Sequence, residues 1–282
     1  MTLQFFILGC GKIGSALLNG WISGIVSGDL DHKADFIIID PFFDANNLNI
    51  PSDAVHVFAT LQDAATAGYA RPDMMLLSVK PQMMAEALGN ATSLDLSGCC
   101  FISIAAGLSL SALTHMIGAG TDVRVIRTMP NTPAAIGKGM TAVIGNEAAQ
   151  EDDLALAESL LGVCGLVIRL DDEAQMDAVT ALSGSGPAYV FLLAETMAQA
   201  GVALGLPEAL SRRLADQTIY GAGGLLQESA MPADILRQNV TSKGGTTAAA
   251  LSVLMGQDGM AELMKKAMSA AHSRSVELGK DS

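Results

Sequence analysis

FFILGCGKIGSALL, residues 5–18, joins an apolar, strand-like run to a helical pattern through three glycines. Gly9, Gly11 and Gly14 form a complete G-x-G-x-x-G at this junction. In a βαβ unit the first glycine permits the sharp turn, the second lets a pyrophosphate approach the backbone, and the third lets the helix pack on the strand. The stretch predicts a dinucleotide-binding turn; the alternative is a tight strand-to-helix turn that binds nothing.

Further apolar runs follow this turn and alternate with helical patterns. The expected strands cover residues 3–9, 35–40, 56–59, 73–79, 99–105, 123–129, 141–145 and 165–170. The expected helices between the earlier strands cover residues 12–24, 61–70, 81–90 and 109–120. Strands that are apolar almost throughout are typical of a parallel sheet covered on both faces. The alternation predicts an α/β domain over residues 1–170 with a Rossmann-like, doubly wound sheet.

Residues 171–282 contain no convincing strand pattern and read as helices punctuated by Gly and Pro. The expected helical segments are 171–184, 186–205, 206–230, 231–240, 245–259 and 260–279. The segment after Pro187 is apolar almost all round, which predicts that it is buried in this subunit or in a partner. We therefore expect a second, all-helical domain over residues 171–282.

The composition narrows the class of protein. Half of the 282 residues are apolar and only 16% are charged, which favours a large subunit interface. A net charge of −13 argues against nucleic acid and anionic membranes as partners. No apolar run approaches the roughly 18 residues needed to span a bilayer, and the N-terminus does not resemble a signal peptide. We expect a soluble, cytoplasmic protein.

The cysteines predict neither disulfides nor a metal site. Cys10, Cys99, Cys100 and Cys164 lie in apolar surroundings without ligand-like spacing. Buried free thiols in a reducing cytosol are the expected state.

Asp40 ends the second expected strand and bears on the choice of cofactor. A carboxylate at this place accepts hydrogen bonds from the adenosine ribose hydroxyls and repels a 2′-phosphate. No Arg or Lys follows in the next several residues to receive that phosphate. The sequence therefore favours NAD over NADP, although Asp40 could instead be a turn former before Pro41.

Three further loops leave the carboxyl ends of expected strands, where open α/β sheets bind ligands. They are SVKPQ, SIAAG and RTMPNTP, residues 78–82, 103–107 and 127–133. Each alone could be a simple connection. Together they favour a wall around a nicotinamide ring.

The motif set as a whole resembles the pyrroline-5-carboxylate reductase family. GCGKIG, VKPQ, SIAAGLS, RTMPNTP, ALSGSGPAYVF and VTSKGGTTAAAL occur in the family's order and spacing, over nearly the whole chain. The resemblance implies reduction of the ring imine 1-pyrroline-5-carboxylate to proline with NADPH or NADH, the last step of proline biosynthesis. It also implies a homodimer formed by the helical domains, with rings of dimers as a further possibility.

The resemblance implies site residues as well. Gly9, Gly11 and Gly14 match the phosphate loop; Lys80, Pro81, Ala106 and Gly107 match the nicotinamide wall, with Asn131 nearby. Lys12, Ile13, Val79 and Ala105 from the same motifs complete the expected cofactor set with Asp40. The matched substrate turn comprises Ser242, Gly244, Gly245, Thr246 and Thr247. Glu228 matches a family glutamate only with the spacing off by about one residue.

Two departures from the family pattern concern charge. Many members have Pro where this chain has Lys243, and Lys243 could either attract the substrate or be solvated. Members that use NADPH usually have Ser, Asn or Arg in place of the DPFFD segment, residues 40–44.

The segment SGSGPAYVF, residues 183–191, suits the entry into a buried helix, and it could also help close the active site of a partner.

The chemistry of the residues agrees with an imine substrate. A helix that begins near Thr246 offers free N–H groups to a carboxylate, and Gly244 and Gly245 let the backbone approach it. His32, His56, His115 and His272 fall in none of the motifs, so the general acid–base group that alcohol oxidation needs is missing. A protonated cyclic imine needs only orientation beside the hydride donor. We expect the Thr247 hydroxyl to act as the catalytic group by hydrogen-bonding the ring nitrogen.

One other function is disfavoured by the sequence, and two further ones remain open. A β-hydroxyacid dehydrogenase would carry a Lys on the buried helix of its second domain, and the segment AYVFLLAETMAQAG contains none. A reductase of another small cyclic imine carboxylate fits the same motifs. A non-catalytic nucleotide-binding regulator would not need the Thr246–Thr247 turn.

Overall fold

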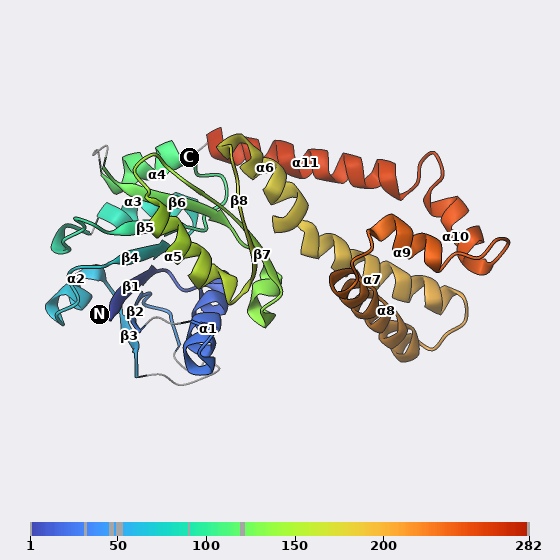
Figure 1. The fold of residues 1–282 in the computed structure, drawn as a ribbon, viewed down its shortest axis with the longest axis horizontal. Helices are drawn as coiled ribbons and strands as arrows, with labels where there is room; N and C mark the ends of the chain where they lie inside the picture. Colours follow the sequence, from blue (N-terminus) through green and yellow to red (C-terminus); the bar gives the residue numbers. More distant parts are fainter. Residues whose placement is uncertain are drawn as a thin grey trace. The chain divides into compact units, whose positions relative to one another are not determined.

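A computed structural model describes residues 2–30, 33–44, 48, 53–89, 91–118 and 122–280. The chain packs into two compact units (Figure 1). The first comprises Met1–Gly184 together with His272–Ser282, and the second comprises Ser185–Ala271. The division into two units describes how the chain packs and assigns no function to either unit. The predicted roles of residues 1–170 in dinucleotide binding and of 171–282 in substrate binding and dimerisation stay predictions.

A single mixed sheet forms the centre of the first unit. Its strands in the described part of the chain are β1 (Leu3–Leu8), β2 (Ala34–Ile39), β3 (Val55–Phe58), β4 (Met74–Leu77), β5 (Cys100–Ser103), β6 (Arg124–Met129), β7 (Gly139–Gly145) and β8 (Gly165–Arg169). Their order is β3-β2-β1-β4-β5-β6-β7-β8, and the first six are parallel. That order is the one found in sheets that bind dinucleotides. The predicted doubly wound sheet is confirmed.

Strand β7 runs antiparallel to β6, which the sequence pattern did not indicate. The connection between Met129 and Gly139 holds only a short 3-10 turn, η3 (Thr132–Ile136). A parallel crossover needs about a dozen residues or more, so this shorter connection returns the chain in the opposite direction. β8 then pairs parallel to β7.

The helices of the first unit lie on both faces of the sheet. They are α1 (Lys12–Ser27), α2 (Leu61–Thr66), α3 (Pro81–Gly89), α4 (Leu110–Ile117) and α5 (Glu151–Gly162). α5 was not among the predicted helices, although Gln150 and Asp153 form a capping box at its start. Asn90 and residues 119–120, at the ends of two predicted helices, lie outside the described residues.

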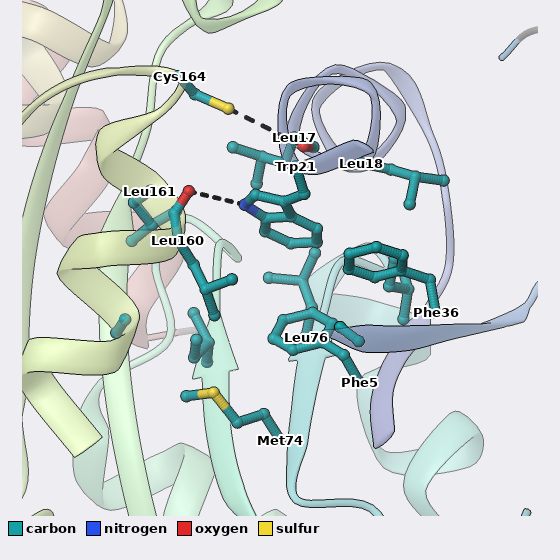
Figure 2. Close-up of a cluster of buried hydrophobic side chains, with 14 of the residues drawn as sticks. Phe5, Leu17, Leu18, Trp21, Phe36, Met74, Leu76, Leu160, Leu161 and Cys164 are labelled. Atoms are coloured by element: carbon teal, nitrogen blue, oxygen red, sulfur yellow. Dashed lines mark hydrogen bonds between the residues drawn. The ribbon is translucent and has the colours of Figure 1, made fainter. Parts of the chain in front are cut away.

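Alternate residues of β1 supply two hydrophobic cores. Phe5 and Ile7 pack with α1 and α5, whereas Phe6 and Leu8 pack with α2, α3 and α4. In the first core Trp21 is fully buried and lies edge-on to Phe5, with ring centroids 4.7 Å apart (Figure 2). Its indole N–H donates to the Leu160 carbonyl at 2.8 Å, so the one polar atom of this side chain is satisfied. The glycine turn thus joins β1 to α1, and both elements are held in place by this packing.

Residues 171–184 form three short helical turns before the long helices begin. They are a 3-10 turn, η4 (Glu173–Gln175), the helix α6 (Met176–Val179) and a π-helical turn, η5 (Thr180–Gly184). The long helices are α7 (Gly186–Ala203), α8 (Glu208–Glu228), α9 (Ala233–Asn239), α10 (Thr246–Leu254) and α11 (Met260–Lys280). No strand occurs between Asp171 and Lys280, all of which the structure describes. The predicted all-helical region is confirmed.

Helix α7 is not buried within this chain. None of its residues is buried, and Phe191 and Leu192 are 65% and 59% exposed. α7 packs against α8, and at Gly201 the Ser211 Oγ lies against the α7 backbone and donates to the Ala198 carbonyl at 2.7 Å. The predicted burial of α7 within this subunit is therefore wrong, and its burial in a partner stays a prediction.

The cysteines behave as predicted. Cys10, Cys99, Cys100 and Cys164 are buried free thiols. Burial raises the pKa of Cys10 and of Cys164 to about 11 each. These side chains are therefore neutral apolar groups at physiological pH. Among the described residues, no helix is long and apolar enough to cross a membrane.

Candidate active site

The glycine turn between β1 and α1 has the geometry that its sequence predicts. Gly9 has a φ of +80°, and a Cβ placed on it would lie 2.7 Å from Cγ1 of Val79. A Cβ on Gly14 would lie 2.8 Å from the Ser78 hydroxyl oxygen. Both positions therefore require glycine, because the turn packs directly on the loop that follows β4.

Packing in the described part of the chain does not require glycine at position 11. No described atom lies within 4 Å of a Cβ placed there. Gly11 caps α1, whose first turn has no acidic residue and no side-chain cap. The backbone N–H groups of Lys12 and Ile13 in this turn are available to an anion. The open space at Gly11 fits a pyrophosphate, and the exposed Lys12 adds positive charge beside it.

Asp40 follows β2 and lies against the glycine turn. Its Oδ2 accepts a hydrogen bond from the backbone N–H of Cys10 at 2.8 Å, and its Oδ1 accepts one from Phe42 N–H at 2.9 Å. Each carboxylate oxygen can accept another hydrogen bond. Asp40 is thus placed both to fix the turn and to receive ribose hydroxyls.

The loop after β4 is the second part of the site. Ser78 N–H donates to the Leu8 carbonyl at 2.9 Å, which joins this loop to the end of β1. Val79 packs against Gly9, Lys80 is exposed, and Pro81 begins α3. The structure therefore brings the predicted residues 79–81 beside the glycine turn.

The loop after β5 is the third part. Ile104 N–H donates to the Leu77 carbonyl at 3.2 Å, so this loop lies next to the one after β4. Ala105 is buried and Ala106 is half-buried. Gly107 has a φ of +82°, and a Cβ there would lie 3.1 Å from Leu278 Cβ at the end of α11. Gly107 thus packs under α11, and its contact with a cofactor stays a prediction.

Asn131 has a structural role that the sequence did not indicate. Its Nδ2 donates to the Ser183 carbonyl at 3.0 Å, and its Oδ1 accepts from Met140 N–H at 2.9 Å. The side chain joins the loop after β6 to the π-helical turn before α7. Its predicted contact with the cofactor would have to coexist with both bonds.

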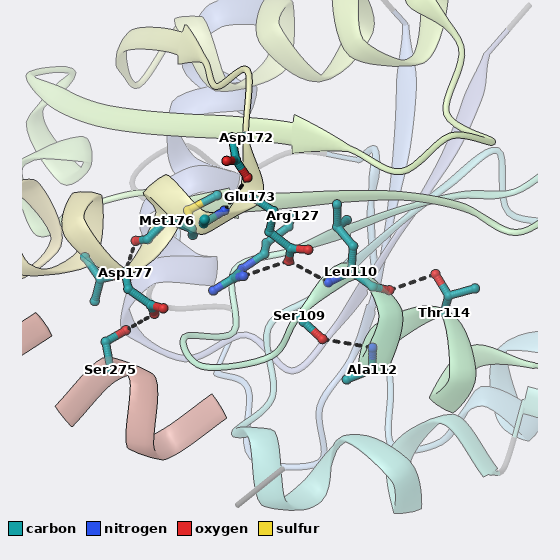
Figure 3. A network of polar contacts seen from close by, with 12 residues as sticks. Ser109, Leu110, Ala112, Thr114, Arg127, Asp172, Glu173, Met176, Asp177 and Ser275 are labelled. Carbon is teal, nitrogen blue, oxygen red and sulfur yellow. Dashed lines mark hydrogen bonds and ion pairs between the residues drawn. The ribbon is translucent and has the colours of Figure 1, made fainter. Parts of the chain in front are cut away.

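Sequence reasoning missed a partly buried ion pair at the end of the β5 loop. Arg127 lies on β6, and its Nη1 is 2.7 Å from Glu173 Oε1 (Figure 3). The same oxygen accepts a hydrogen bond from Leu110 N–H at 2.7 Å. The signal for this pair was an arginine in the middle of the strand RVIRTM, because a buried charge requires a partner.

The second glycine turn, in the second unit, leads into α10. Gly244 has a φ of +73°, and Gly245 caps the helix without a side-chain cap. A Cβ on Gly245 would collide with the Ser242 hydroxyl. No acidic residue occupies the first turn of α10, and Thr247 Oγ1 makes no hydrogen bond to any residue that the structure describes. The turn therefore presents free N–H groups and a free hydroxyl.

The remaining predicted residues have simple surroundings. Glu228 is the exposed last residue of α8, and Lys243 is exposed and pairs with no acid in the described part of the chain. His56 lies 4.0 Å from Asp35 on the outer strands, away from these loops. His32 lies outside the described residues.

The fold and these turns define a class. Dinucleotide-dependent oxidoreductases typically have a doubly wound sheet with a glycine turn at its carboxyl edge, followed by a helical domain. Residues 4–107 match the family model described as NADP oxidoreductase, coenzyme F420-dependent. Residues 173–278 match the one described as pyrroline-5-carboxylate reductase dimerisation, so the chain carries a dimerisation domain.

Whole-chain comparisons give the family. The pyrroline-5-carboxylate reductase of Synechocystis sp. is 35% identical over 99% of this chain and 100% of its own length. That of Haemophilus influenzae is 40% identical over 82% of this chain and 86% of its own. The crystal structure of the Plasmodium falciparum pyrroline carboxylate reductase with NADP bound superposes with a TM-score of 0.79 and 29% identity, covering 99% of this chain and 98% of that one. The chain belongs to the pyrroline-5-carboxylate reductase family, as its motifs predict.

Proposed function

We propose that the protein reduces the C=N bond of 1-pyrroline-5-carboxylate to give L-proline, with NAD(P)H as the hydride donor. The observation that carries this proposal is the pair of uncapped helix N-termini at Gly11 and Gly245, each preceded by a glycine with positive φ. One turn suits the cofactor's phosphates and the other suits the substrate's carboxylate.

The cofactor end uses the loops at the carboxyl edge of the sheet. Gly11, Lys12 and Ile13 hold the pyrophosphate, and Asp40 receives the adenosine ribose. The loops at 79–81 and 105–107 hold the nicotinamide half. When bound, the nicotinamide supplies the hydride.

The substrate end uses the turn from Ser242 to Thr247. The N–H groups at the start of α10 and its positive dipole end bind the carboxylate. The Thr247 hydroxyl, free of other partners in the described part of the chain, accepts a hydrogen bond from the protonated ring nitrogen. Lys243, exposed within this turn, would attract the carboxylate, and the weakly matched Glu228 stays a prediction without an assigned contact.

No ionisable acid–base group is needed for this reaction. A cyclic imine can bind already protonated, so its carbon accepts hydride without a proton transfer in the same step. His56, His115 and His272, the histidines in the described part of the chain, belong to none of the loops above. Orientation and carboxylate binding are the contributions of the protein.

We infer a preference for NADH over NADPH. The carboxylate of Asp40 is fixed beside the turn by two backbone N–H groups. A 2′-phosphate would bring a second negative charge to this place, and like charges close together repel.

Two observations support assembly into at least a homodimer: the exposed apolar side chains of α7 and the dimerisation domain that the chain carries. Rings of dimers remain a finer proposal. A cytoplasmic location agrees with four buried free thiols, which persist in a reducing compartment.

Turnover tests the function directly. Purified protein is assayed with 1-pyrroline-5-carboxylate and NADH or NADPH side by side, following loss of the nicotinamide absorbance and formation of proline. Rapid turnover is expected with the five-membered imine, and slower turnover with its six-membered homologue. Nucleotide binding without turnover of either imine would instead support a non-catalytic regulator.

A further inference from the structure

We propose that the Arg127–Glu173 pair positions the β5 loop, residues 104–109, for the nicotinamide half of the cofactor. The pair touches neither cofactor nor substrate in this proposal, so it acts through the loop. The inference rests on the proposed role of this loop in cofactor binding.

Glu173 joins two elements through one oxygen. Its Oε1 accepts from Leu110 N–H and from Arg127 Nη1, each at 2.7 Å (Figure 3). Leu110 is the first residue of α4 and directly follows the loop. Arg127 lies on β6 in register with Ser103, the last residue of β5. Glu173 therefore fixes the far end of the loop relative to the strand beside its near end.

The near end is fixed independently. Thr128 Oγ1 donates to the Ser103 carbonyl at 3.0 Å, and Ser103 Oγ accepts from Ala105 N–H at 3.2 Å. The middle of the loop packs against α11 at Gly107, so its two ends and this contact together set the conformation of residues 104–109. Displacing the start of α4 would shift the end of the loop that leads into it.

Glu173 is itself held in place. It begins the 3-10 turn η4, whose capping residue Asp172 accepts from Ala174 N–H at 2.9 Å. Four residues later Asp177 accepts from the Ser275 hydroxyl at 2.6 Å, which ties this segment to the last turns of α11. The carboxylate of Glu173 is thus a rigid support for α4.

The pair is poorly suited to a purely stabilising role. The Arg127 side chain is only 7% exposed, and its Nε finds no acceptor in the described part of the protein. Burying a charged group with an unsatisfied donor is costly, and apolar replacements of buried ion pairs are often neutral or stabilising. The pair therefore costs stability, and what it provides is a fixed geometry of the β5 loop.

The test separates the nicotinamide half of the cofactor from the rest. Affinities for NADH and for ADP-ribose, which lacks nicotinamide, are measured by calorimetry for the wild type, Glu173→Ala and Glu173→Gln. Losing an acceptor shared by two donors should weaken NADH binding and raise its KM about ten- to a hundredfold in Glu173→Ala. ADP-ribose affinity should not change. Glu173→Gln keeps an acceptor oxygen for Leu110 N–H and should recover most of the loss.

Glu158→Ala is the matched control. Glu158 also pairs with an arginine, Arg169, and its side chain is 30% exposed, as is that of Glu173. It lies on α5, away from the β5 loop, so NADH and ADP-ribose affinities should both be unchanged. The inference is overturned if ADP-ribose binding falls together with NADH binding, if Glu158→Ala gives the same loss, or if Glu173→Ala binds NADH normally. Absence of imine reduction by the wild type would refute the proposed function, whereas the contrast between NADH and ADP-ribose still decides the role of the pair.

Discussion

The carboxylate of Asp40 accepts a hydrogen bond from the backbone N–H of Cys10, 2.8 Å away. This bond joins the end of β2 to the middle of the glycine turn, so one residue serves both the shape of the turn and its charge. A substitution at Asp40 therefore changes two properties, and a test of cofactor preference has to separate them.

We expect Asp40→Asn and Asp40→Ser to shift the preference toward NADPH. Both remove the negative charge, but Asn keeps an oxygen that can accept from Cys10 N–H. The ratio of kcat/KM for NADPH to that for NADH should rise about tenfold, equivalent to about 1.4 kcal/mol. If Ser lowers kcat/KM with both cofactors while Asn does not, the hydrogen bond to the turn accounts for the difference. A wild type that already prefers NADPH tenfold would refute the interpretation of Asp40.

The glycines of the turn predict opposite phenotypes. Gly9→Ala places a methyl group 2.7 Å from Val79 Cγ1 at a φ of +80°, and it should cost about 1–2 kcal/mol of unfolding free energy or more. Gly11→Val adds a side chain where no described atom lies within 4 Å, but valine is a poorer N-cap than glycine, so the loss of stability should stay below about 1 kcal/mol. NADH binding should nevertheless be lost, because the new side chain fills the place of the pyrophosphate.

Urea unfolding and calorimetry of the same samples check this contrast. A stable Gly11→Val that binds NADH normally would mean that the open space at Gly11 is not the phosphate site.

The sheet could be predicted from sequence because its strands are apolar on both faces. Residues such as Phe5 and Phe6 point to opposite cores, and this pattern is local. The direction of β7 could not be predicted, since it depends on how far the chain between Met129 and Gly139 can reach. The pattern likewise did not show that α7 lacks cover within its own chain, because an apolar helix looks the same in either environment.

The candidate site likewise has one part that could be predicted from sequence and one part that could not. The glycine turns are contiguous in sequence, so their residues could be named from sequence, and their roles stay predictions. The bond from Asn131 to Ser183 and the pair of Arg127 with Glu173 join segments 52 and 46 residues apart. Sequence indicates that a buried arginine needs a partner, but only the fold selects which carboxylate it meets.

The cysteines predict how stability depends on pH. Burial raises the pKa of Cys10 and Cys164 to about 11 and that of Cys100 to about 12, above the value of about 8.5 in an unfolded chain. The folded protein therefore binds more protons than the unfolded chain above about pH 8.5, and stability should fall from there to about pH 12. Urea unfolding at several pH values measures the fall, and Cys164→Ala should reduce its slope. Rapid labelling of folded protein by a thiol reagent at pH 8 would contradict the assigned burial.

The apolar surface of α7 predicts a loss of assembly on charge substitution. Phe191 is 65% exposed in the single chain, and burying such a side chain contributes about 1.5–3 kcal/mol. Phe191→Glu should therefore shift the protein toward monomers at micromolar concentration in light scattering. Ile136→Glu is the control, since Ile136 is 73% exposed but lies on η3 in the first unit. Equal effects of the two substitutions would argue against an α7 interface.

The hydroxyl of Thr247 gives the most direct test of the substrate turn. If it hydrogen-bonds the imine nitrogen, Thr247→Ala should lower kcat/KM for the imine about ten- to a hundredfold, because a hydrogen bond to a charged group contributes about 1.5–3 kcal/mol. The Kd for NADH should stay unchanged. Thr247→Ser keeps the hydroxyl and should retain most activity. Ser252→Ala, further along α10, is the control, since its hydroxyl already donates to the Ala249 carbonyl at 2.7 Å.

Gly245 separates the hydroxyl from the backbone of the same turn. Gly245→Val should be worse than Thr247→Ala, because its Cβ collides with the Ser242 hydroxyl and fills the space before the free N–H groups of α10. The loss should appear as a raised KM for the imine, with NADH affinity again unchanged. If Thr247→Ala is fully active at both limiting and saturating imine while Gly245→Val is not, the hydroxyl has no catalytic part. The turn would then act as a carboxylate-binding site only, through the backbone N–H groups and the dipole of α10.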